Sequence, residues 1–153
     1  MQKQFEILIK SRELILKVIE NLTNEQLNKI PKGFNNNIIW NIAHLMVTQQ
    51  LLCYKFAGLK CLVSEEMIEN FRKGTAPTYT VLNDEVNLII ARFQELPKQL
   101  KKDYDRGLFD NYKEYTTSVN VTLRNIDDAI YFNTYHEGIH MGIILQLIKC
   151  IEL

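Results

Sequence analysis

The apolar repeat over residues 126–151 constrains the fold more than any other segment of the chain. Its inward positions recur in steps of four and three, which is the pattern of a helix that packs against other helices. These positions are Ile126, Ile130, Asn133, Glu137, His140, Ile144, Leu147 and Ile151. His136 and His140 are four residues apart, so the helical period places both imidazoles on one face. We predict a helix from about Asn125 to Cys150 that presents two histidines.

Three earlier segments also show helical stripes. The first predicted helix runs from about Gln2 to Asn21. The second runs from about Asn37, where Asn35-Asn36-Asn37 offers an N-cap, to Ala57, where Gly58 ends it. The third begins near Thr80, and Pro97 must kink or restart it because proline cannot donate to the preceding turn. With only 3 prolines and 6 glycines, the chain has little room for a turn-rich all-β fold. We predict an all-α protein with one domain over residues 1–153.

The connections between these helices carry signals of their own. Thr23 precedes a short helix as N-cap, with Gln26 three residues later as in a capping box. Ser64 is expected to cap another short helix that ends at about Asn70. The connection over residues 59–79 is unusually long, and long connections in compact domains often cover a site. Residues 104–123 favour extended backbone, so an irregular excursion with a short hairpin is expected there.

The third and last histidine of the chain lies in the second predicted helix. Trp40, His44, Val47 and Leu51 follow one another in steps of four, three and four, so His44 is expected on an apolar, inward face. We hypothesise that His44, His136 and His140 converge on one divalent metal. The alternative is that each histidine is a hydrogen-bonded core residue, because pairs with this spacing also occur without metal.

Imidazole nitrogens suit zinc, nickel, copper and iron(II). Three histidine ligands leave at least one coordination position for water or substrate, whose pKa the metal lowers. Spacing alone does not choose among these metals.

The segment His136-Glu137-Gly138-Ile139-His140 also fits H-E-x-x-H, the pattern of zinc metalloproteases. We disfavour that function because no histidine lies in residues 141–146 and the only glutamate downstream is Glu152. No predicted strand precedes the helix to align a peptide. Glu137 remains a candidate catalytic general base or an acceptor for a ligand histidine, and the alternative is a polar residue between helices.

Three other polar residues are weaker candidates for supporting the ligands or contacting substrate. They are Asn41, Asn133 and Tyr135.

Charge and cysteine content exclude several classes of function. Lysine plus arginine equals aspartate plus glutamate at 18 each, and a nucleic-acid partner would require a basic surplus or stripe. No apolar run approaches the ~20 residues that cross a bilayer, and the N-terminal residues lack a signal pattern, so no membrane partner is expected. The three cysteines lack disulfide spacing, which indicates reduced thiols in the cytoplasm; Cys61 is the one to test for reactivity.

Two motifs in this order resemble the DinB-like superfamily. They are Trp40-Asn41-Ile42-Ala43-His44-Leu45 and His136-x-x-x-His140-x-Gly142, and the resemblance covers almost the whole chain. It implies a four-helix bundle with an up-up-down-down path and a long crossover between the second and third helices. It also implies that His44, His136 and His140 bind zinc or nickel, and that the protein is a homodimer. Met141 and Ile143 stand near positions where the family often has Arg and Gln.

Families related to this one use the same scaffold for thiol-dependent chemistry, namely transfer of low-molecular-weight thiols such as bacillithiol and mycothiol-dependent isomerisation. Our first hypothesis is therefore a metal-dependent enzyme with a small-molecule substrate, either a thiol S-transferase or a hydrolase. The alternative is a non-catalytic metal- or ligand-binding stress-response protein. An open fourth coordination position favours the enzyme, and a fourth protein ligand favours the alternative.

Overall fold

The computed structural model describes residues 1–151, and this part of the chain is mostly helical with one small two-stranded sheet. The elements in chain order are α1 (Gln2–Ile19), α2 (Asn24–Asn28), α3 (Ile38–Gln49), the π-helix η1 (Gln50–Lys55), α4 (Glu65–Phe71), α5 (Asn83–Asp105), β1 (Tyr115–Thr116), β2 (Thr122–Leu123) and α6 (Ile126–Ile151). The four predicted long helices are all present, and their observed bounds lie close to the expected ones. None of the helices in the described residues combines the length and hydropathy needed to cross a membrane.

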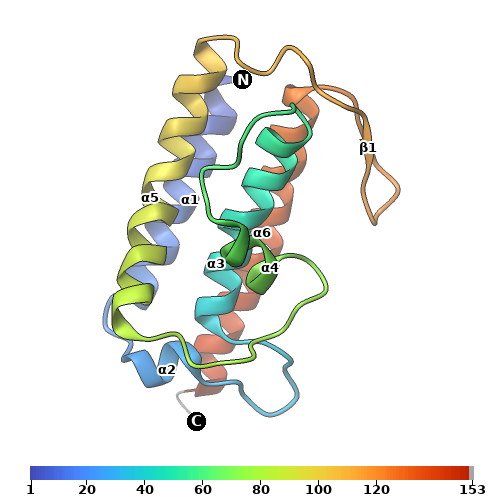
Figure 1. The fold of residues 1–153 in the computed structure, drawn as a ribbon. Coiled ribbons are helices and arrows are strands. Elements are labelled where there is room, and N and C mark those ends of the chain that lie inside the picture. Colours follow the sequence, from blue (N-terminus) through green and yellow to red (C-terminus); the bar gives the residue numbers. More distant parts are fainter. Residues whose placement is uncertain (152–153) are drawn as a thin grey trace.

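The four long helices pack side by side. α1 contacts α5 and α6, and α3 contacts the same two helices from the other side (Figure 1). α3 is the most enclosed element, since almost all of its residues are buried. Removing its apolar side chains from water is the main driving force that holds α3 in place. His44 is therefore fixed to a rigid, interior helix.

The directions of the long helices differ from the up-up-down-down order that the resemblance implied. Asn24, at the start of α2, bonds Asn83 at the start of α5, while Phe5 of α1 packs on Tyr104 at the end of α5. Tyr104 also donates to Asp127 at the start of α6, 2.8 Å away. Hence α1 and α6 run one way, and α3 and α5 run the other way (Figure 1).

The connection over residues 56–82 is the reason for this order. It leads back along the molecule, so α5 begins at the same end as α3 and the two helices are parallel (Figure 1). The predicted long crossover is therefore present.

The predicted N-caps are confirmed. Thr23 and Gln26 form a reciprocal capping box, and Ser64 caps α4 by accepting from the amide of Met67. Asn37 caps α3 by accepting from the backbone N–H of Trp40 at 2.9 Å. These caps satisfy amides that the first turn of a helix leaves without partners, and they set where each helix begins.

Pro97 lies inside α5, which continues through it without a restart, one of the two outcomes expected there. Proline has no N–H, so it cannot bond the carbonyl of Phe93 four residues earlier. Arg12 of α1 bonds that carbonyl instead, with Nη1 2.9 Å from the Phe93 oxygen. A side chain from a neighbouring helix thus satisfies the group that the proline leaves open.

The second predicted helix does not keep one geometry throughout. α3 changes into η1 at Gln50, and the wider π-helical turn continues to Lys55 before Gly58 ends the segment with a φ of +73°. π-helical turns are rare and frequent at functional sites. Here the change lies one to two turns after His44 on the same continuous helix.

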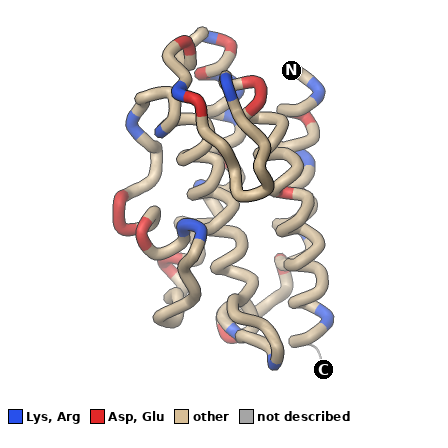
Figure 2. Tube along the Cα trace, turned by 90° about the vertical axis from the view of Figure 1, so that its right-hand side faces the viewer, with Lys and Arg blue, Asp and Glu red and all other residues tan. Residues whose placement is uncertain are grey.

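The predicted hairpin is confirmed. β1 pairs with β2 in antiparallel register, Tyr115 opposite Leu123, and the ring of Tyr115 stacks on Phe56 with centroids 4.3 Å apart. In the view of Figure 2 the hairpin lies in front of the helices. Its tip, residues 117–121, contains no charged residue (Figure 2). It thus forms an uncharged cover next to the end of η1.

Candidate metal centre

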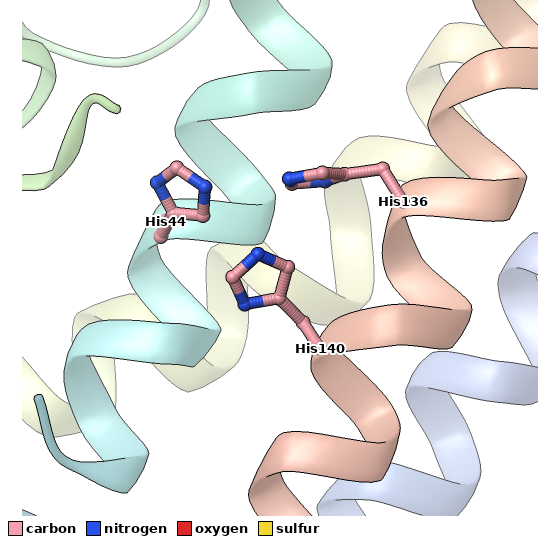
Figure 3. A group of neighbouring side chains, drawn as sticks. All are labelled: His44, His136 and His140. Atoms are coloured by element: carbon pink, nitrogen blue, oxygen red, sulfur yellow. The ribbon is translucent and has the colours of Figure 1, made fainter. Parts of the chain in front are cut away.

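The three histidines of the chain meet between α3 and α6. His44 comes from α3, and His136 and His140 come from successive turns of α6 (Figure 3). One ring nitrogen from each can be chosen so that all three lie within 4.8 Å of one another. The convergence expected from the sequence is therefore confirmed, and the group can hold a metal ion.

His44 is held by two neighbours. Its Nδ1 lies 2.7 Å from the carbonyl oxygen of Phe71 in the connection after α3. A carbonyl only accepts, so Nδ1 carries the proton and Nε2 keeps the lone pair that a metal requires. Trp40 stacks on the imidazole from one turn earlier, with centroids 4.7 Å apart and the planes 8° from parallel. Both contacts restrict the ring to one orientation. With this tautomer, the hydroxyl of Thr48 donates to Nε2 at 3.3 Å, at the lone pair that a metal would use.

His140 is oriented in a similar way by Asn41, which is completely buried. The amide nitrogen of Asn41 donates to Asn36 Oδ1 and to the carbonyl of Asn37, at 3.0 and 2.7 Å. Its Oδ1 therefore faces His140, whose Nδ1 lies 2.8 Å away and donates to it. The lone pair of Nε2 remains available, as in metal sites whose histidines donate their other N–H to an oxygen.

His136 differs from the other two histidines because its Nδ1 is buried and has no hydrogen-bond partner within residues 1–151. An unpaired buried polar atom is costly and is uncommon in folded proteins. A cation bound between the rings would provide a partner for buried ring nitrogens of this kind. The donor set, three imidazoles on rigid helices, thus fits a divalent transition metal.

A tetrahedral zinc site provides a scale for this arrangement. Zn–N bonds of about 2.0–2.1 Å place the nitrogens about 3.4 Å apart. The three nitrogens lie within 4.8 Å of one another, so their largest separation exceeds this distance by at most about 1.4 Å.

Burial keeps all three rings neutral near pH 7. Desolvation, together with the neighbouring His140 and His44, lowers the pKa of His136 to about 3. Desolvation, with His44, lowers the pKa of His140 to about 4. The pKa of His44 is also lowered by burial, although its bond to Phe71 opposes the shift. Neutral imidazoles have a free lone pair, which metal coordination requires.

A cavity of about 380 Å³ opens onto the three histidines. Its other lining residues come from α3 and η1, the crossover, the hairpin and α6. They are Thr48, Leu51, Leu52, Lys55, Phe56, Lys73, Tyr115, Thr117, Ser118 and Phe132. The walls are mainly apolar, as is usual for small-molecule sites. A metal held by the histidines would therefore face a space large enough for a ligand.

Glu137, the candidate general base, occupies a different place. Its carboxylate accepts from Arg12 of α1, with Nη2 2.6 Å from Oε1, and from the amide of Asn133 at 3.1 Å. Arg12 is buried as well and also lies over the ring of Phe93, 4.4 Å from its centroid. Among the described residues that line the cavity, Glu137 is absent. Its contacts are those of a buried ion pair between helices.

The remaining candidates are dispersed. Asn133 is buried beside Glu137, and Tyr135 is 56% exposed on the outer side of α6. Cys61 is half-buried, and burial raises the pKa of its thiol, which reduces the thiolate fraction. Sequence reasoning missed Arg12, although it continues the buried stripe of α1 between Leu8 and Ile15.

Comparison with known protein families supports the resemblance noted in the sequence. A family model described as the DinB superfamily matches residues 7–144, about nine-tenths of the chain. The match includes all three histidines. A search of curated proteins finds no match.

Proposed function

We propose that this chain, which belongs to the DinB superfamily, is a metal-dependent enzyme that acts on a small molecule in the cavity beside His44, His136 and His140. The observation that carries the proposal is the coincidence of three features. Ring nitrogens from two helices converge, the rings are neutral near pH 7, and a mainly apolar cavity opens onto the same three side chains. We also assign the four long helices to the four-helix bundle of the superfamily.

The three histidines would hold zinc or nickel, the metals that the superfamily resemblance favours. A divalent metal held there lowers the pKa of a thiol or water and so supplies a nucleophile near neutral pH. The chain's own residues supply orientation: Phe71 and Asn41 fix the tautomers of His44 and His140. The crossover and the hairpin enclose the ligand, and Leu51, Phe56 and other apolar lining residues exclude water from its body.

Two reaction types suit this site, transfer of a low-molecular-weight thiol to an electrophile and hydrolysis. Both need a nucleophile and room for a second reactant, which the cavity provides. Incubation of metal-loaded protein with a small thiol and an alkyl halide should consume both faster than metal-free protein does. Equal rates of consumption by metal-loaded and metal-free protein would contradict the proposed S-transferase activity.

A non-catalytic metal- or ligand-binding protein is the second candidate. In such a protein, a fourth protein ligand would close the metal site, or the surrounding residues would permanently exclude small molecules from it. The cavity beside the histidines favours the enzyme, since it gives access to the fourth position.

The metal itself can be tested directly. Wild-type protein should contain about one equivalent of zinc or nickel by elemental analysis, and His136→Ala and His140→Ala should contain little. Cys61→Ser and Cys150→Ser serve as controls, because neither thiol belongs to the histidine group, and both should keep the wild-type content. Full metal content in both histidine variants would overturn the proposed site.

We also propose that the protein is a homodimer through the outer side of α6. Tyr131, Tyr135 and Ile139 are 51%, 56% and 44% exposed and are spaced by four residues, so they form one apolar stripe. Gly138 and Gly142 flank it, and a Cβ added to either would meet no atom within 4 Å. An exposed, apolar helix face of this kind is suited to burial against a second copy.

A further inference from the structure

The charged residues that line the cavity all have the same sign. Lys55 and Lys73 both contribute to the lining, and no aspartate or glutamate is among the described lining residues. The whole chain, in contrast, has 18 basic and 18 acidic residues. The cavity is therefore a local concentration of positive charge on a neutral protein.

Lys73 is held near the site by a short ordered loop. Phe71, two residues before it, is buried and bonds His44 through its carbonyl oxygen. Gly74 follows with a φ of +90°, and Thr75 accepts a hydrogen bond from Trp40 Nε1 at 3.3 Å. Phe71 and Thr75, on either side of Lys73, are thus hydrogen-bonded to the rings of His44 and Trp40 in α3. These bonds place the backbone of Lys73 beside the candidate metal centre.

Lys55 reaches the cavity from the end of η1. The backbone N–H of Gly58 donates to the carbonyl of Lys55 at 3.0 Å, which closes the turn after the π-helix. Phe56, the next residue, lines the cavity and stacks on Tyr115 of the hairpin. Leu51, Leu52 and Lys55 of η1 line the same space.

Neither lysine is neutralised by a close carboxylate. Within the described residues, no ion pair closer than 4.0 Å involves Lys55 or Lys73. Clefts with charge of one sign and apolar walls focus the electric field and raise the local concentration of oppositely charged ligands. A divalent metal on three neutral histidines would add further positive charge at the inner end.

We infer that the substrate of this site carries an anionic group, such as a carboxylate, which Lys55 and Lys73 bind while its reactive end faces the histidines. This inference rests on the proposed function and adds the chemical class of the substrate. The apolar residues between the two ends, Leu51, Phe56 and Phe132, would contact an aliphatic or aromatic middle part. The ligand class is thus a small amphiphilic anion with a thiol or other metal-binding group.

Two thiols that differ only in charge test the inference. Zinc-loaded protein is titrated in a calorimeter with 6-mercaptohexanoate and with 6-mercaptohexanol at low ionic strength. We expect the carboxylate to bind about tenfold more tightly, with about a threefold contribution from each lysine. The preference should decrease at high salt because exposed charges are screened.

Lysine variants then locate the effect. Lys55→Gln and Lys73→Gln should each reduce the preference about threefold, and the double variant should remove it. Lys98→Gln is the matched control, since Lys98 is exposed on α5 and does not line the cavity. All three positions are exposed, so unchanged circular dichroism and melting temperature are expected and confirm that each variant is folded.

The outcomes separate the two proposals. Equal affinity of both thiols for wild-type protein, or a preference that survives in the double variant, overturns the anionic substrate but leaves the metal-dependent enzyme intact. Failure of both thiols to bind zinc-loaded protein overturns the S-transferase proposal, and the inference with it. Loss of the preference in Lys98→Gln as well would show a general charge effect and would overturn the role of Lys55 and Lys73.

Discussion

The guanidinium of Arg12 and the carboxylate of Glu137 form an ion pair of 2.6 Å in which both side chains are at most 2% exposed. The pair joins α1 to α6, and the same guanidinium bonds the Phe93 carbonyl that Pro97 leaves open in α5. One side chain therefore links three helices. Glu137 lies between His136 and His140 in the sequence, so this link also fixes the rotation of the ligand-bearing helix.

Removing one member of this pair is expected to destabilise the protein strongly. Arg12→Met leaves a buried carboxylate and an unpaired Phe93 carbonyl, and it should lower the free energy of unfolding by about 3–5 kcal/mol. The measurement is urea unfolding followed by circular dichroism. Lys10→Met is the control, because its pair with Glu13 is exposed and its loss should leave the stability close to that of the wild type.

The double variant Arg12→Met with Glu137→Leu separates an unpaired charge from lost packing. It should recover part of the stability lost in Arg12→Met, since no buried charge remains without a partner. A double variant that is less stable than either single variant would contradict this explanation.

The sequence was sufficient for elements whose signals are local. The N-caps at Thr23, Asn37 and Ser64 each depend on a side chain within three residues of the bond it makes, so pattern alone located them. The convergence of the histidines was also predictable, because the apolar stripes around His44 and His140 indicate which face of each helix points inward.

Features that depend on contacts between distant residues were not predictable. The passage of α5 through Pro97 depends on Arg12, which is 85 positions earlier in the chain. The direction of the long helices depends on where the crossover leads, and the tautomer of His140 depends on Asn41 in another helix. Arg12 had one usable signal, its place in the stripe of Phe5, Leu8, Ile15 and Ile19. A charged residue there requires a buried partner, and Glu137 holds the equivalent place in α6.

Asn41 is expected to tune metal affinity through His140. Asn41→Leu removes the acceptor at 2.8 Å from Nδ1, so the zinc dissociation constant should rise about 10- to 100-fold in competition with a chelating dye. Asn41→Asp keeps an acceptor for Nδ1 but loses the donor to Asn36 and Asn37, so it should lose less affinity than Asn41→Leu. Asn87→Leu, at an exposed position of α5, should have no effect. Equal affinity of the Leu and Asp variants would show that the bond does not matter.

Gly74 is expected to be required for its backbone conformation. With a φ of +90°, it lies in a region that residues with a Cβ adopt at a cost, so Gly74→Ala should lower the free energy of unfolding by roughly 1–2 kcal/mol. Gly74→Asn should lose less, because asparagine tolerates positive φ better. Chemical denaturation of the three proteins measures the order. An alanine variant as stable as wild type would mean that the loop relaxes without cost.

If the proposed homodimer forms through α6, a charge placed on this face should change the molar mass in solution rather than the stability. Wild-type protein should elute at twice the mass of the chain in light scattering, and Tyr135→Glu should elute as a monomer because it places a charge in the apolar stripe of α6. Leu14→Glu is the control, since Leu14 is 44% exposed on α1 and lies outside that stripe. A monomeric wild type, or a dimeric Tyr135→Glu, would contradict the proposed interface.

Metal removal should destabilise the wild-type protein and leave a histidine variant unchanged. A ligand that binds only the folded state stabilises it by an amount that grows with its concentration, about 4 kcal/mol at a thousandfold excess over the dissociation constant. For a chain of this length that corresponds to a decrease of roughly 10 °C in Tm when a chelator is added to zinc-loaded protein. His136→Ala has lost one of the three nitrogens, so its Tm should not respond to chelator. Equal shifts in both proteins would place the stabilising metal away from His136, because the effect would then not depend on that ring.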